Sequence, residues 1–353
     1  MSLSFISFAT ISLGLNQPPD EPQPKVEDFN KRTSQLEIKN SAAERLEAIK
    51  WLTARAESIH ASLAVPGLER CLKTDPDAEV RGQAVQCRAM IAAKRNESCP
   101  LSVVEAMLDK DESVSQLAAT CGELFKTFSP GSSEILLRCT KSKNAVLRSG
   151  CLTLLARAGG KEKNVVEAIR QARKDKSFAV RHSAHVALFQ TTDDLPEYLT
   201  YFIRLQEDPE GALGRLEGDA DDVNRERVTL ELARLGSATL IAKWSDDRPS
   251  ELASALVKLL GDPTPAMRRG AARLIGAASQ KIDQKSGTEP SKGRKRTRQP
   301  EPSSAVPYFQ KLNAMSRLRE LAENDIDATV RNAAGAAMKT LAAVQPIPKL
   351  PRL

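Results

Sequence analysis

DIDATVRNAA, at residues 325–334, is the stretch that decides the fold, because variants of the same phrase return throughout the chain. The phrase recurs at residues 75–84, 175–184 and 262–271. A self-similar period of about 33 residues is the signature of a solenoid, in which each repeat packs only on its neighbours. The sequence therefore predicts one stacked array rather than several separate globular domains.

Eight copies of the phrase align on the position that Asp325 holds, which we call the anchor. The anchors are Lys39, Asp75, Asp109, Ser142, Asp175, Asp219, Asp262 and Asp325. Two residues after each anchor comes a residue type that caps helix N-termini well: Ser41, Asp77, Asp111, Asn144, Ser177, Asp221, Thr264 and Asp327. The fifth position after the anchor is mostly apolar and the ninth mostly small. Positions four apart share a helix face, so each copy predicts a capped helix with one packing stripe.

Each copy also contains a second helix, whose start is marked by Pro, Ser or Asn. The marking residues are Pro66, Pro100, Ser132, Asn164, Pro196, Ser250 and Pro307. Only 4% of the residues are aromatic, and an apolar content dominated by small and aliphatic residues suits close helix-on-helix packing. Two copies are longer than the others, and we place their extra residues at 207–218 and 237–248. The prediction is an all-α chain of two-helix hairpins.

An Asp anchor, a capping residue, Val-Arg and then Ala, in paired helices, resembles the HEAT repeat, in particular the short HEAT-like type of phycobilisome lyases. The resemblance covers residues 41–343. It implies an all-α, right-handed superhelical solenoid of about eight two-helix repeats, an armadillo-like superhelix, with the second helices lining its concave side. Function does not follow from this fold, because the family contains scaffolds, transport factors, regulatory subunits and a few enzymes.

The resemblance further implies that anchor aspartates bond to the arginines six positions after each anchor, across the turns between neighbouring repeats. The residues concerned are Asp75, Arg81, Asp175, Arg181, Asp219, Arg225, Asp262, Arg268, Asp325 and Arg331. The third copy departs from the pattern, because Ser115 stands where the other copies have Arg. Regular placement beside capped helix starts favours an internal polar ladder over an anion-binding stripe, since buried Arg is usually paired.

Composition divides the chain into four segments. Residues 1–38 are expected to be a flexible leader, and residues 1–15 resemble a signal peptide, although no Lys or Arg precedes the apolar run. The repeat array occupies residues 39–343, with a disordered basic insertion at 280–304. Residues 344–353 form a Pro-rich tail. Export through the N-terminal signal and a cytoplasmic location both remain open, and no segment is expected to anchor the chain stably in a membrane.

The net charge of +7 is concentrated in the insertion, where seven basic residues lie between positions 281 and 298. The rest of the chain is nearly balanced, which does not favour a global surface for nucleic acid. The insertion itself offers candidate contacts to an anion or to nucleic acid: Lys292, Arg294, Lys295, Arg296 and Arg298. The alternative is a solvated loop without a partner.

Basic residues also gather where the second helices are expected to end. Candidate partner-binding residues are Arg70, Lys73, Arg138, Lys141, Arg170, Arg173 and Lys174. They would form a basic ridge along the concave edge for an acidic protein, a phosphate-rich polymer or an anionic lipid. Alternatively, these residues only stabilise the helix C-termini, because the helix dipole and the free carbonyl groups there attract cations. Both interpretations stay open.

Catalytic constellations are missing from the sequence. His182 and His185 lie one helical turn apart, as two metal ligands can, but no acidic or Cys partner accompanies them. Six cysteines occur without a Cys-x-x-Cys pair, and small buried thiols are expected. We predict no catalytic residue, no metal and no cofactor.

These observations favour a non-catalytic scaffold that mediates protein–protein interaction through the concave surface of its second helices. A first alternative is a nucleic-acid-binding solenoid that uses the basic insertion. A second alternative, suggested by the resemblance, is a lyase-like or chaperone protein acting on a tetrapyrrole-bearing partner. The sequence specifies neither the partner nor the oligomeric state.

Overall fold

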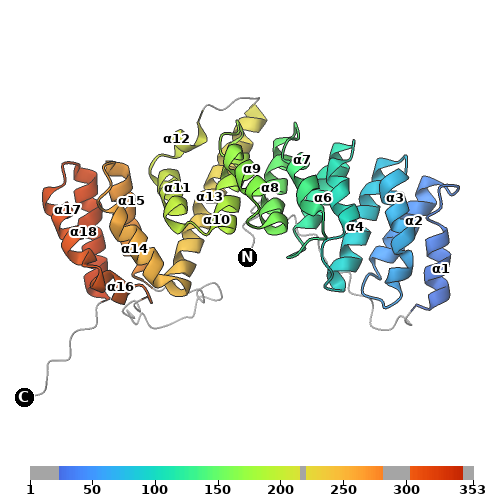
Figure 1. Ribbon diagram of the computed structural model, residues 1–353, viewed down its shortest axis with the longest axis horizontal. Coiled ribbons are helices and arrows are strands. Elements are labelled where there is room, and N and C mark those ends of the chain that lie inside the picture. Colours follow the sequence, from blue (N-terminus) through green and yellow to red (C-terminus); the bar gives the residue numbers. More distant parts are fainter. Residues whose placement is uncertain (1–23, 215–219, 281–302, 345–353) are drawn as a thin grey trace, which may run out of the picture. The chain divides into compact units, whose positions relative to one another are not determined.

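The computed structural model describes residues 24–214, 220–280 and 303–344, and regular structure in these ranges is helical (Figure 1). One isolated bridge joins Cys99 and Phe128. The chain divides into two compact units, Met1–Asp193 and Asp194–Leu353. The predicted all-α class, built of repeated helices, is confirmed. None of the described helices is long and apolar enough to cross a lipid bilayer.

The first unit contains a row of first helices that pack each on the next. They are α2 (Ala42–Thr53), α4 (Ala78–Lys94), α6 (Glu112–Gly122), α8 (Ala145–Gly159) and α10 (Phe178–Thr192). Each begins directly after its predicted capping residue. The side chains of Ser41, Asp77, Asp111 and Asn144 accept hydrogen bonds from backbone N–H groups of the first turn, whereas Ser177 holds the cap position without such a bond.

Second helices form the other row of this unit. They are α3 (Val65–Thr74), α5 (Leu101–Glu105) with its 3-10 extension η2 (Ala106–Leu108), α7 (Ser132–Cys139) and α9 (Lys163–Ala172). The helix α3 packs on α4, α7 on α8 and α9 on α10, so a second helix lies mainly against the first helix of the following copy. Successive second helices also contact one another. Their C-terminal ends therefore follow one edge of the unit.

The predicted packing stripe forms the core of the first unit. Val80, Val114 and Val180, five residues after their anchors, are buried. Ala84 and Ala118, nine residues after theirs, are fully buried. Small side chains at the second position let neighbouring helices approach closely, which explains why the column tolerates little beyond Ala and Cys.

The expectation of a flexible leader as far as residue 38 needs correction. Residues 26–34 form helix α1 (Val26–Ser34), and Phe29 is fully buried. The Phe29 ring meets the Trp51 ring edge-on, with centroids 5.0 Å apart. Leu36 is also buried. Because α1 packs on α2 and η1 (Ala61–Ala64) and Leu36 lies beside Gly67, the segment packs on the array rather than remaining flexible.

The second unit contains the remaining helices. They are α11 (Leu195–Glu207), α12 (Pro209–Leu213), α13 (Ala220–Asp247), α14 (Pro249–Leu259), α15 (Pro265–Ala278), α16 (Val306–Lys311), α17 (Ala314–Asn324) and α18 (Ala328–Ala343). The helix α15 packs on α11, α14 and α18, and α17 packs on α18 (Figure 1). Asp327 caps α18 as predicted, accepting from the N–H groups of Thr329 and Val330.

Two predictions about helices of the second unit were wrong. The extra residues placed at 237–248 are not a separate insertion, since α13 runs unbroken for 28 residues and includes most of them. Asp221 consequently lies inside a helix and not at a cap. The single helix expected after Pro307 is interrupted at Asn313, whose φ of 55° is left-handed and ends α16 before α17 begins.

Cys139 of α7 and Cys151 of α8 form a disulfide, with Cα atoms 6.1 Å apart. The expectation of buried thiols throughout was therefore wrong for this pair. It fails because the two positions face each other across one helical hairpin, a proximity that the repeat columns did not reveal. Four other cysteines are free and buried: Cys71, Cys87, Cys99 and Cys121.

Several predictions lie outside the described residues. They concern the signal-like stretch at residues 1–15, Asp219, the basic insertion with Lys292, Arg294, Lys295, Arg296 and Arg298, and the Pro-rich tail from residue 345.

Candidate functional site

A row of Arg–Asp contacts links consecutive repeats, and we call it the polar ladder and each Arg–Asp contact a rung. Arg81 illustrates one rung. Its Nε and Nη2 atoms donate to the two carboxylate oxygens of Asp109, each at 2.8 Å. Its Nη1 donates to the carbonyl oxygens of Asp75 and Pro76. The guanidinium thus joins the anchor of its own copy to the anchor of the next.

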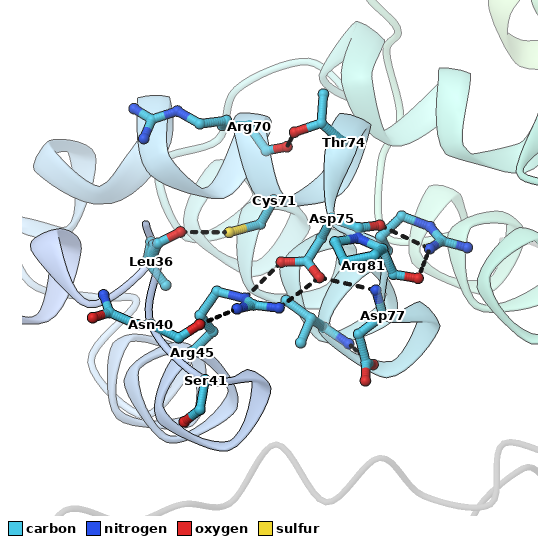
Figure 2. A network of polar contacts seen from close by, with 12 residues as sticks. Leu36, Asn40, Ser41, Arg45, Arg70, Cys71, Thr74, Asp75, Asp77 and Arg81 are labelled. Carbon is cyan, nitrogen blue, oxygen red and sulfur yellow. Dashed lines mark hydrogen bonds and ion pairs between the residues drawn. The ribbon is translucent and has the colours of Figure 1, made fainter. Parts of the chain in front are cut away.

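Figure 2 shows Asp75 between the arginines of two successive rungs. Arg45 donates from Nη2 to Asp75 Oδ1 at 2.9 Å, and the backbone N–H of Asp77 donates to the same oxygen at 3.0 Å. The Arg45 and Asp75 side chains are only 5% and 1% exposed. A buried carboxylate that is paired and hydrogen-bonded in this way fixes the turn before α4 as well as the contact between repeats.

Equivalent rungs occur further along each unit. Arg148 Nη2 and Nε donate to Asp175 at 2.7 and 2.9 Å. In the second unit, Arg268 Nε and Nη2 donate to Asp325 at 2.6 and 2.9 Å. The recurrence of one bidentate geometry explains why Asp and Arg hold these columns: their role is to connect repeats.

Hydrogen bonding shifts the ladder pKa values. The pKa of Arg81 is raised, chiefly by its hydrogen bonds to Asp109. Desolvation raises the pKa of Asp109, but the bonds from Arg81 and from the Asp111 N–H outweigh it, so the net shift is downward. The pKa of Asp325 is lowered, mainly by Arg268. Both partners of a rung are therefore held in their charged forms.

The ladder departs from prediction at Arg225. Arg181 and Arg331 keep the regular bond to their own anchors, donating to the carbonyl oxygens of Asp175 and Asp325 at 2.7 Å each. Asp219, the predicted partner of Arg181 in the next copy, lies outside the described residues. Arg225 does not take the ladder position: its side chain is 65% exposed and lies 3.4 Å from Asp222 on the same helix. Arg225 is the sixth residue of the long α13, whereas Arg81 is the fourth residue of α4. Asp262 accepts from the Thr264 N–H at 2.8 Å.

The third rung lacks both charged partners. Ser115 replaces the arginine, and Ser142 replaces the next anchor aspartate. The Ser115 hydroxyl donates to the Glu112 carbonyl within its own helix, at 2.9 Å. Beside the two serines lies an open cavity of about 330 Å³ between η2, α6, α7 and the start of α8. We call it the third-rung cavity.

Basic side chains gather at the C-terminal ends of the second helices in the first unit, along what we call the basic edge. Its members are Arg70, Lys73, Lys110, Arg138, Lys141, Lys143, Arg170, Arg173, Lys174 and Lys176. All are exposed except the half-buried Arg173. Lys73 pairs with Glu105 at 3.1 Å. The predicted partner-binding residues thus lie at or just after the C-terminal ends of the second helices in the first unit.

The histidine and cysteine candidates lie at buried or partly buried positions. His182 stacks on Phe178, with centroids 6.0 Å apart, and burial lowers its pKa to about 4. Burial raises the pKa of Cys87, Cys99 and Cys121 to about 12 and that of Cys71 to about 11, so these thiols stay protonated at neutral pH. Among the described residues, no group of three or more His, Cys, Asp or Glu side chains could hold a metal ion.

A second open cavity, of about 430 Å³, lies in the second unit between α11, α13 and α15. Phe202, Ile203 and Leu274 line its apolar part. Glu207, whose side chain is 2% exposed, closes one side by pairing with Arg269 and Arg273. The charges at this cavity are largely engaged with one another, which distinguishes it from the third-rung cavity.

The third-rung cavity was not predicted from the sequence, although one of the two substitutions that create it was noticed. The absence of Arg at Ser115 was noted, but its coincidence with the absence of Asp at Ser142 was not. Comparing the Arg position of each copy with the anchor position of the next copy would have shown that the third rung has neither an arginine nor an aspartate. The cavity itself depends on packing between helices and has no signature in the sequence.

Comparison with solved structures returns engineered proteins. One engineered protein is 14% identical, with 89% of this chain and 99% of that chain covered and a TM-score of 0.36. A structure of computationally designed armadillo repeat proteins for modular peptide recognition is 15% identical over 88% and 99%, with a TM-score of 0.25. A designed armadillo repeat protein is 16% identical over 89% and 99%, with a TM-score of 0.23. No protein-family model and no curated protein matches the sequence.

Proposed function

We propose that this chain is a non-catalytic helical-repeat scaffold that binds an acidic segment of a partner protein along the basic edge of its first unit. The observation that carries the proposal is the alignment of exposed cations on consecutive second helices. The arginines of the described rungs, by contrast, are held by anchor aspartates and are not exposed. An extended acidic segment could follow such an edge from one helix end to the next.

Helix dipoles alone account less well for the basic edge. A dipole favours cations within the last turn of a helix, by less than about 1 kcal/mol each at exposed positions. Lys110, Lys143 and Lys176 lie beyond the helix ends, one residue after their anchors, and still continue the basic edge. Their placement supports a surface for an anionic partner.

Fluorescence anisotropy of a labelled Glu-rich peptide tests the proposal. We expect the full-length chain to bind the peptide, with affinity that falls as salt increases. Replacing Arg70, Arg170 and Lys174 together by Glu should weaken binding by at least about tenfold. The matched control reverses Lys258, Lys311 and Lys339, three exposed bases of the second unit, and should leave binding unchanged. Equal losses in both triple variants would contradict a specific edge.

The nucleic-acid alternative is separated in the same assay. A labelled DNA duplex replaces the peptide, and residues 281–298 are deleted. Binding of DNA but not of peptide, lost on the deletion, would favour that alternative over the scaffold. The tetrapyrrole alternative predicts visible absorbance of the protein as purified, whereas the scaffold predicts none.

A further inference from the structure

We propose that the third-rung cavity binds a phosphoryl group carried by the acidic segment of the partner. The inference deepens the proposed function by assigning one group of the ligand to one site. It starts from the two serines. Arg and Asp hold the equivalent positions in the rungs on either side, Arg81–Asp109 and Arg148–Asp175.

Serine in place of both the rung arginine and the anchor aspartate leaves space between the two copies and removes the negative charge of the anchor. A rung arginine fills the gap between the turns of two copies, whereas Ser115 is short and bonds within its own helix. Ser142 keeps the local role of an anchor, because its hydroxyl accepts from the Asn144 N–H at 3.2 Å as an anchor carboxylate does. The fold of the turn is thus preserved without the carboxylate that would repel an anion.

Cations surround the cavity. Lys110, Arg138, Lys141 and Lys143 all contribute to its lining, and none of them forms an ion pair with another described residue. Two carboxylates also line it, but Asp109 is already held by Arg81. The other, Glu112, accepts from the Gln116 and Asn144 side-chain amides. The cavity is therefore electropositive.

The charge and size of the cavity favour a phosphoryl group over a carboxylate. A phosphoryl ester carries about 1.5 to 2 negative charges at pH 7 and three acceptor oxygens, which suits several separate cationic donors. A side-chain carboxylate carries one charge. With about 330 Å³ open to solvent, the cavity can admit a phosphorylated side chain from outside.

A cationic guest is the competing interpretation. In other rungs the arginine donates to the anchor carbonyl oxygen and to the next one, and the corresponding carbonyls here belong to Asp109 and Lys110. A guanidinium from a partner could donate to them. The exchange of the anchor Asp for Ser142 decides against this guest, because a site for a guanidinium would gain from keeping the carboxylate.

The test compares a labelled acidic peptide bearing one phosphoserine with the same peptide bearing serine, using the full-length chain and anisotropy. We expect the phosphopeptide to bind at least about tenfold more tightly. Ser142→Asp restores the anchor carboxylate and should remove this preference, while Ser142→Asn, which can still cap the turn, should keep it. Ser115→Arg combined with Ser142→Asp rebuilds the rung and should also remove the preference without lowering the melting temperature.

Competition on the unmodified chain gives a second readout that needs no variant. Inorganic phosphate should displace the phosphopeptide more effectively than chloride at equal ionic strength. Displacement by phosphate that is no stronger than displacement by chloride would overturn the inference. Equal binding of the two peptides would overturn it as well. If the acidic peptide still depends on Arg70, Arg170 and Lys174 in that case, the scaffold function stands and only the phosphoryl site falls.

Discussion

At the scale of residues, arginines at the same repeat position have different structural roles in different copies. Arg81 is nearly buried, with 4% of its side chain exposed, and holds two anchors together. Arg225 occupies the same column and is exposed on α13. The two arginines hold the same repeat position, so the sequence alone predicts the same contribution to stability for both. Only their burial and their ion-pair partners show that these contributions differ.

Truncation of these two arginines provides a matched comparison. Arg81→Ala leaves Asp109 without its partner, and loss of one member of a buried pair costs roughly 3 to 5 kcal/mol. Arg225→Ala removes an exposed side chain whose ion pair is worth about 0 to 1 kcal/mol. Urea unfolding monitored by circular dichroism measures both. Similar losses of unfolding free energy in the two variants would contradict the structural role given to the ladder.

The rung of Arg268 and Asp325 predicts a pH dependence. Arg268 lowers the Asp325 pKa below its ordinary value of 3.8, so the folded state holds the proton less tightly than the unfolded state. The resulting stabilisation is complete above pH 3.8 and is lost as the pH falls through the folded-state pKa. The melting-temperature gap between the native chain and Asp325→Asn should therefore narrow below pH 3.8. A gap that stays constant to the lowest accessible pH would disprove the assignment.

At the scale of elements, much of the structure follows from the sequence. The caps and packing stripe predicted first helices such as α4 and α18 with their starts correctly placed. The length of α13, the break at Asn313 and the helix before residue 39 were not predicted. In each case tertiary packing or a single backbone conformation overrides the repeat pattern, and neither leaves a periodic signal.

The contact between α11 and α15 depends on Gly270. A Cβ atom at this position would lie 2.3 Å from Ile203 Cγ2, so a larger residue forces the helices apart. Gly270→Ala should destabilise the chain by about 1 to 3 kcal/mol, and Ile203→Ala should partly rescue it. Gly335→Ala in α18 is the control, because no atom lies within 4 Å of its Cβ position, and it should stabilise by up to about 1 kcal/mol. Thermal melts of the four proteins distinguish these outcomes.

The disulfide between α7 and α8 predicts a thiol count. Titration of the native chain with a thiol reagent in denaturant, without reductant, should find four thiols: Cys71, Cys87, Cys99 and Cys121. Prior reduction should expose all six cysteines. Six thiols without reductant would show that Cys139 and Cys151 are not joined in the native chain.

At the scale of the whole molecule, the recurring Asp and Arg columns connect neighbouring repeats. Asp and Arg recur because each rung needs them, and this regularity was legible in the sequence. Only part of the candidate site could be predicted from the sequence. The basic residues at the helix ends were predicted. The third-rung cavity was not, because it depends on two neighbouring copies both lacking their charged ladder residue and on how the helices pack around the gap. Function is therefore proposed where the ladder is interrupted.

Amide hydrogen exchange of the full-length chain, with and without the phosphoserine peptide, tests this claim most directly. The account predicts that the peptide slows exchange in residues 106–115 and 138–147, which surround the third-rung cavity, and along the neighbouring helix ends of the basic edge. Slowed exchange confined to residues 281–302 or to the cavity between α11, α13 and α15 would contradict it.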